Sequence, residues 1–83
     1  MLKLDTRCNK TVIKLIKYLR EFRETEGISK NELSQRSGVS RSSIRKIELG
    51  ESSPSLYLLL LLTNSLGLDL GALLSEIEKT YKT

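Results

Sequence analysis

Residues 29–50 read SKNELSQRSGVSRSSIRKIELG and predict two short helices joined by a tight turn. Ser29 precedes the first helix and can accept a backbone amide as its N-cap, while Glu32 stands where it would complete a capping box. Gly38 interrupts the helical pattern, because glycine adopts the left-handed backbone conformation at low energetic cost. We therefore expect the first of the two helices over residues 29–36.

The second helix, expected over residues 40–49, has two faces of opposite chemistry. Ile44 and Ile47 stand three residues apart and share one face, which predicts that this face is buried. The opposite face is cationic and hydroxylated and carries Arg41, Ser42, Arg45 and Lys46. Such a face suits the major groove of DNA, where Arg and Lys donate to guanine and Ser can pair with several bases.

Further landmarks lie upstream and downstream of the turn. They are residues 19–24 and 27–29 upstream, and Glu48-Leu49-Gly50, Pro54-Ser55-Leu56, Leu66-Gly67-Leu68 and Leu73-Leu74 downstream. The series resembles the Cro/repressor family of helix-turn-helix proteins, also called the lambda-repressor-like or XRE family. The resemblance covers about residues 16–76 and implies an all-α fold, a compact five-helix lambda-repressor-like DNA-binding domain.

Apolar residues at helical spacing predict a first helix over residues 10–26, ended by Gly27. Residues 1–9 show no clear period and form either an N-terminal arm or an early helical turn. At 83 residues, the chain is expected to form one helix-turn-helix domain over 1–83.

Two more helices are expected towards the C-terminus. Ser53 can cap a helix over residues 54–65, with Pro54 at the first helical position, where the missing amide hydrogen does no harm. A fifth helix is expected over residues 69–81.

Charge and composition narrow the function classes. Of the 14 Lys and Arg, seven lie in residues 1–23 against two acids, whereas residues 51–83 carry two Lys and four acids. This uneven distribution of charge favours a nucleic-acid ligand, because only one face of the protein meets the phosphates.

With no His and a single Cys, a Cys/His zinc site or a disulfide within one chain is excluded, and no cofactor is expected.

An enzyme is the least favoured class, since no Ser-His or Cys-His pair and no phosphate-binding glycine loop is present. The longest apolar run, Leu56 to Leu62, is too short to span a bilayer, so no membrane partner is expected. A single Cys and no apolar leader fit a cytoplasmic protein. The family resemblance implies that a bacterium, phage or plasmid encodes it.

The resemblance implies roles for individual residues. Arg41, Ser42 and Lys46 match positions that face base edges, and Arg45 can reach a base or a phosphate. Candidate phosphate ligands lie near the helix N-termini, where free amides attract anions, and they are Lys30, Ser40 and Ser43. Ser40 fits a plain helix cap equally well.

Arg23 and Glu48 match two family positions that form an ion pair between the first helix and the end of the recognition helix. A bidentate pair there would fix how the motif docks on the first helix. The alternative is two unrelated surface charges.

Residues 56–62 are more apolar than one core face requires. Leu56, Leu59, Leu60 and Leu62 match the family's buried positions, so Tyr57, Leu58 and Leu61 are expected to point outward. With Ile77 and Tyr81 of the fifth helix, they predict a homodimer or partner surface. The alternative is cover within one subunit, by residues 1–12 or the fifth helix. A two-fold dimer implies a palindromic operator.

These observations favour a sequence-specific regulator of transcription that binds double-stranded DNA, as a repressor. The alternative is an antitoxin of a toxin–antitoxin pair, which binds its own promoter and holds a small protein partner through the fourth or fifth helix.

Overall fold

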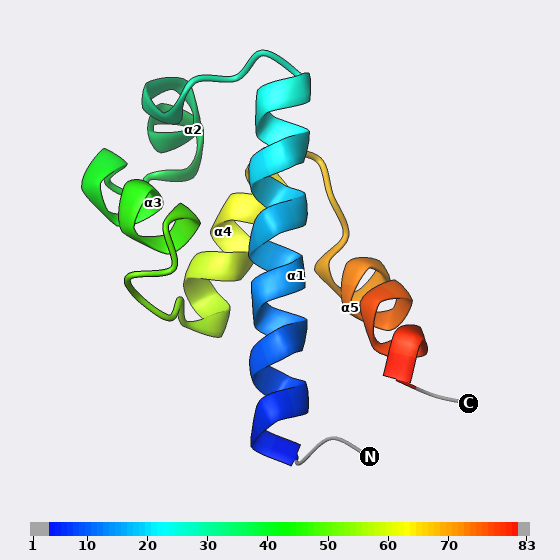
Figure 1. Cartoon of the computed structure of the whole chain (residues 1–83). Coiled ribbons are helices and arrows are strands. Elements are labelled where there is room, and N and C mark those ends of the chain that lie inside the picture. The colour runs from blue at the N-terminus through cyan, green and yellow to red at the C-terminus, as the bar shows by residue number, and fades with distance from the viewer. Residues whose placement is uncertain (1–3, 82–83) are drawn as a thin grey trace.

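Residues 4–81 fold into five α-helices and one short 3-10 helix (Figure 1). The computed structural model describes the backbone of residues 4–81 and the side chains of residues 6–80. The elements are α1 (Leu4–Thr25), α2 (Lys30–Ser37), α3 (Arg41–Glu48), α4 (Leu56–Ser65), α5 (Leu70–Glu78) and η1 (Lys79–Tyr81). No strand occurs among the described residues, so the predicted all-α, five-helix fold is confirmed.

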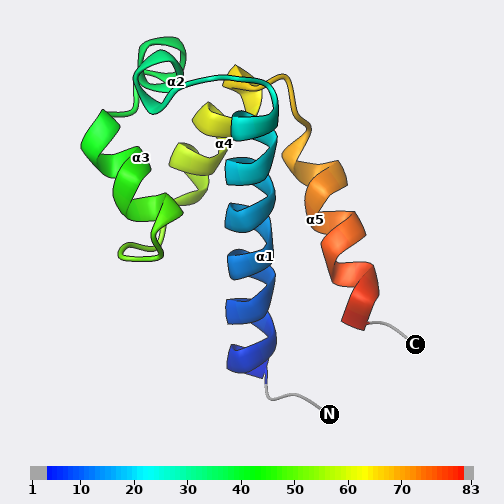
Figure 2. The same cartoon turned by 45° about the horizontal axis from the view of Figure 1, so that its top comes forward.

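Helix α1 forms the spine of the molecule. Its 22 residues span about 33 Å at the α-helical rise. In both views α2, α3 and α4 lie on one side of α1 and α5 lies on the other (Figures 1 and 2). Residues 4–9, which the sequence left open between an arm and a helical turn, belong to α1.

The core forms where the apolar stripes of all five helices meet. Its buried residues are Leu15, Ile16, Leu19, Leu33, Val39, Ile44, Ile47, Leu62, Leu66 and Leu70. Burying each such side chain contributes about 1.5–3 kcal/mol relative to exposure. The helix-turn-helix supplies four members, so α2 and α3 are held on α1 and α4 by a continuous apolar contact.

Short polar contacts set the turn between α2 and α3. Gly38 has a φ of +78°, as expected for the residue that ends α2. The Ser37 side chain is buried, and its Oγ accepts the amide of Val39 at 3.1 Å. The turn therefore holds its shape through one glycine conformation and one side-chain hydrogen bond.

The N-cap of α2 is made as predicted, but the capping box is incomplete. Ser29 Oγ accepts the Glu32 amide at 3.0 Å. The Glu32 carboxylate pairs instead with Arg36, one turn further along the same helix. The expected reciprocal contact from Glu32 to the Ser29 amide is therefore wrong, because Arg36 offers the carboxylate a charged partner.

Helix α4 begins later than expected. Ser55, not Ser53, is its N-cap, and Ser55 Oγ accepts the Leu58 amide at 3.1 Å. Pro54 consequently precedes the cap instead of occupying the first helical position. Both serines are suitable caps, and the pattern of residues 53–55 did not distinguish them.

The facing of α4 also differs from the prediction. The expected burial of Leu56 and Leu60 is wrong, since their exposed fractions are 64% and 40%. Leu58 and Leu61, which were expected to point outward, are partly buried and pack against the core. The reason is geometric, because Leu58, Leu61 and the buried Leu62 share one helix face that is turned to the core.

The remaining residues of the predicted apolar surface also include both exposed and partly buried side chains. Tyr57 is 69% exposed, as expected. Ile77 of α5 is partly buried against the core, so its assignment to an outer surface is wrong. The side chain of Tyr81 lies outside the described residues.

Candidate nucleic-acid interface

The outward face of α3 is polar and cationic, and the described residues leave it exposed. Ile44 and Ile47 are buried, with exposed fractions of 1% and 3%. The four residues of the opposite face are all exposed, and they are Arg41, Ser42, Arg45 and Lys46. Within the part of the chain that the structure describes, none of these four side chains forms an ion pair or hydrogen bond. The face is therefore available to an external ligand.

Hydroxyl groups gather at the N-terminus of α3. Ser40 Oγ accepts the Ser43 amide at 3.1 Å and donates to Ser43 Oγ at 2.9 Å. Ser40 is exposed and Ser43 is half-buried. Ser40 thus acts as the N-cap while its oxygen remains at the surface.

Lys30 stands at the first position of α2 and is exposed. The first amides of a helix carry partial positive charge and lack intrahelical acceptors, which suits them to phosphate oxygens. The ammonium group of Lys30 adds a full charge beside such amides. Chemically, the two helix starts can bind anions and the cationic face of α3 can donate hydrogen bonds.

A buried ion pair joins α1 to the end of α3. Arg23 Nε donates to Glu48 Oε2 at 2.7 Å, and Arg23 Nη2 donates to Glu48 Oε1 at 2.9 Å. The exposed fractions of the two side chains are 7% and 9%. The structure therefore places these residues together as a bidentate pair, the arrangement with the most restricted geometry.

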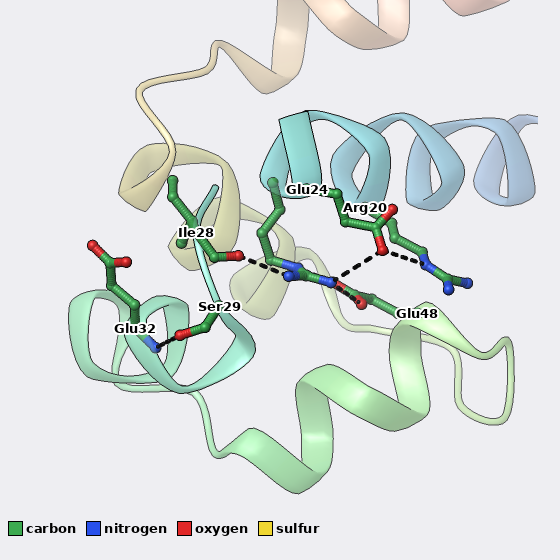
Figure 3. A network of polar contacts seen from close by, with 7 residues as sticks. Arg20, Glu24, Ile28, Ser29, Glu32 and Glu48 are labelled. Carbon is green, nitrogen blue, oxygen red and sulfur yellow. Dashed lines mark hydrogen bonds and ion pairs between the residues drawn. The ribbon is translucent and has the colours of Figure 1, made fainter. Parts of the chain in front are cut away.

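The same guanidinium is surrounded by further acceptors. Arg23 Nη1 donates to the main-chain carbonyl of Ile28 at 2.7 Å, and Glu24 Oε2 lies 4.0 Å from Nη2. Figure 3 shows Ile28, Glu24 and Glu48 arranged around this one group. The contact links α1, the segment before α2, and the end of α3, so it sets the position of the whole helix-turn-helix.

The hydrogen bonds to Glu48 raise the pKa of Arg23 above its ordinary value. Burial acts against this rise, while the charges of Glu48 and Glu24 add to it. Because the raised pKa belongs to the folded state, the contribution of Arg23 to the free energy of unfolding is fully present below the ordinary arginine pKa. It is lost only as the pH rises through the folded value, so the guanidinium keeps its charge at neutral pH.

Sequence patterns did not reveal the part played by Ile28. Its side chain is an ordinary partly buried apolar group, and the functional atom is its carbonyl oxygen. A main-chain acceptor has no residue signature, so only the fold brings it to Arg23. The signal nearest to it is Gly27, whose φ of +71° turns the chain at this point.

Comparison with known proteins gives the family. The model of a helix-turn-helix family matches residues 19–73, which includes α2, the turn and α3. The chain belongs to this family, the XRE/Cro-type helix-turn-helix proteins. No curated protein and no solved structure gives a significant match.

The family is a regulatory one and binds DNA. The chain is accordingly a DNA-binding regulator of transcription, and double-stranded DNA is its partner.

No single helix among residues 4–81 has the length and apolar character needed to cross a membrane. Helices α4 and α5 reach these values only as a pair, and that pair is bent by 108°.

Proposed function

We propose that this regulator is a repressor that inserts α3 into the major groove of its operator. The observation that carries the proposal is the division of α3 into two faces. Two isoleucines anchor it to the core, and four polar or cationic side chains on the other side lack partners within the described residues. The major groove admits an α-helix, and hydrogen-bond donors on the outward face of such a helix can reach the base edges.

The four outward residues are assigned to base reading, and they are Arg41, Ser42, Arg45 and Lys46. An arginine can donate two parallel hydrogen bonds to guanine, which distinguishes it from the other bases. Each such contact contributes about 1–3 kcal/mol of discrimination against a wrong base.

Lys30, Ser40 and Ser43 are assigned to the phosphate backbone. The exposed oxygen of Ser40 and the ammonium of Lys30 lie at the starts of α3 and α2, where free amides reinforce them. Such contacts fix the register of a protein on the duplex and carry no sequence information. Their loss weakens binding to all sequences alike.

Two copies are proposed to bind a palindromic site. The exposed side chains of α4 form an apolar surface of Leu56, Tyr57 and Leu60, which we call the α4 surface. Pairing of two α4 surfaces around a two-fold axis would remove these groups from water. It would place two recognition helices about 34 Å apart, one turn of the duplex.

The second candidate function, an antitoxin, uses the same α4 surface. Large exposed apolar side chains fit a protein partner as well as a second copy. Sedimentation separates the two functions. Self-association of the purified chain supports the repressor, and a monomer that co-purifies with a small protein supports the antitoxin.

Selection of bound sites from random duplex DNA tests the proposed function. We expect two inverted half-sites whose centres are about 10 base pairs apart. A salt titration of the selected site should give a steep linear fall of log affinity, with a slope that counts the phosphates engaged. Recovery of sites without a sequence preference would contradict the proposal.

A further inference from the structure

A hollow of about 400 Å³ lies where the chain passes from α4 to α5. Leu60 and Asn64 of α4 form one wall, and residues 67–71 form the other. Two of the lining residues, Gly67 and Gly71, have no side chain that could fill the space. A Cβ atom added to Gly67 would meet no atom within 4 Å, so the space beside it is open.

Gly71 is an unexpected lining residue because it lies within the first turn of α5, where its φ is not positive. Glycine is less favourable than alanine at such a helical position. Outside its own helix backbone, a Cβ at this position would meet only the exposed Asp69 carboxylate, at 3.3 Å from Oδ1. The packing of the core therefore does not require glycine here, and its effect is to keep the hollow open.

The hollow continues the exposed stripe of α4. Tyr57, Leu60 and Asn64 follow one another at intervals of three and four residues, so they lie on one helix face. All three are exposed, and Tyr57 is 69% exposed without lining the hollow. The seven residues from Tyr57 to Asn64 span about 10 Å along the helix axis. One face of α4 therefore carries a projecting ring at its start and a hollow at its end.

The ring and the hollow are complementary when two copies of the chain meet. If two α4 helices lie antiparallel across a two-fold axis beside Leu60, residue 57 of each copy comes opposite residue 64 of the other. Both rings then reach a hollow at the same time. No charged residue occurs in α4, so like charges on this helix do not oppose the approach.

We propose that the hollow binds the side chain of Tyr57 from a second copy of this chain. The ring packs against Leu60 and Leu68, and its hydroxyl donates to Asp69. The carboxylate is available for this bond, since Asp69 Oδ1 accepts the Ala72 amide and no donor within the described residues contacts Oδ2. A buried tyrosine hydroxyl generally needs such an acceptor. The inference rests on the proposed pairing of two copies through the α4 surface and specifies its geometry.

The first test removes the ring. Sedimentation equilibrium of the full chain over a range of concentrations gives the Kd of self-association. Tyr57→Ala should raise this Kd by at least about tenfold, because two rings are lost from each dimer. Tyr18→Ala is the matched control and should leave the Kd unchanged, because Tyr18 is a 42% exposed tyrosine of α1 that does not line the hollow.

The second test fills the hollow. Gly71→Gln should also raise the Kd by at least about tenfold, although glutamine favours the helix more than glycine does. Ala72→Gln is the matched control, because it adds the same side chain at an exposed neighbouring residue that does not line the hollow. Thermal unfolding at low protein concentration checks that both variants are folded.

The decisive experiment mixes the two variants. Tyr57→Ala retains an open hollow and Gly71→Gln retains its ring, so a mixed dimer keeps one of the two contacts while either variant alone keeps neither. We expect an equimolar mixture to associate about tenfold more tightly than either variant alone. A general loss of apolar contact would not produce this recovery.

Three results would overturn the proposal: an unmodified chain that stays monomeric at every concentration, a Tyr57→Ala variant that associates as tightly as the unmodified chain, or a mixture no tighter than its components. Binding to a duplex with a single half-site separates these failures from failure of the proposed DNA-binding role. None of the altered residues is assigned to DNA, so each variant should bind the half-site as the unmodified chain does.

Discussion

Helices α3 and α4 are both short and both begin after a serine N-cap, yet they use their side chains in opposite ways. Of its eight residues, α3 buries Ile44 and Ile47, and it turns charged and hydroxylated side chains outward. Helix α4 starts with seven consecutive apolar residues and leaves three of them exposed. The difference supports the proposed roles, in which α3 binds a polar ligand and α4 makes an apolar contact.

The largest expected effect concerns the ion pair that holds the end of α3. Arg23→Ala leaves a buried carboxylate and a main-chain carbonyl without their donor, and should lower the free energy of unfolding by about 3–5 kcal/mol. Chemical denaturation measures this change. Arg20→Ala is the matched control on the same helix, since its exposed contact with Glu24 is worth less than about 1 kcal/mol.

Equal effects of the two arginine variants would contradict the role of the buried pair. The double variant Arg23→Met with Glu48→Leu should recover most of the lost stability, because no buried charge is then left alone.

The facing of α4 is tested by two leucines of one helix. Leu62→Ala should destabilise the chain by about 2–5 kcal/mol, because Leu62 is 4% exposed and leaves a cavity. Leu60→Ala, at a surface position, should change stability by about 0.5 kcal/mol. Denaturation at low protein concentration measures these changes in stability without a contribution from self-association. A reversed order would show that α4 is turned the other way.

The two serine caps offer the next comparison. Ser40→Ala and Ser55→Ala should each cost about 1 kcal/mol of stability, because each removes the acceptor of one helix-start amide. Their effects on DNA affinity should differ. Ser40→Ala should also weaken binding to the operator, since its oxygen is assigned to a phosphate, whereas Ser55→Ala should leave binding unchanged. Identical DNA affinities would leave Ser40 with a capping role alone.

The smallest expected effect is that of Lys30. Lys30→Gln should lower the slope of log affinity against log salt by about 1, with the same sequence preference. Lys79→Gln is the control, because Lys79 lies in η1 and pairs with Glu76. An unchanged slope in Lys30→Gln would remove Lys30 from the phosphate contacts.

The contrast between α3 and α4 also explains how far sequence patterns predicted the molecule. In α3 the polar residues mark the outer side, so both the buried isoleucines and the exposed face followed from helical spacing. In α4 every residue from 56 to 62 is apolar, and the pattern contains no mark of the outer side. The orientation then depends on the contacts of α4 with α2 and α5, which only the fold supplies.

Two other differences have the same origin. Ser53 and Ser55 are equally suited by residue type to cap α4, and the structure uses Ser55. The carbonyl of Ile28 can be identified as an acceptor only from the fold, which brings it to Arg23. The family resemblance, by contrast, implies the partnership of Arg23 with Glu48, and the structure confirms it.

The most direct test of α3 as the reading helix compares the base preferences of the unmodified chain and of Arg41→Ala. Both proteins are used to select sites from the same random duplex library. We expect Arg41→Ala to relax the preference at one base pair in each half-site and to keep the remaining positions and the half-site spacing. An unchanged preference at every position would contradict the assignment of this face of α3 to the major groove.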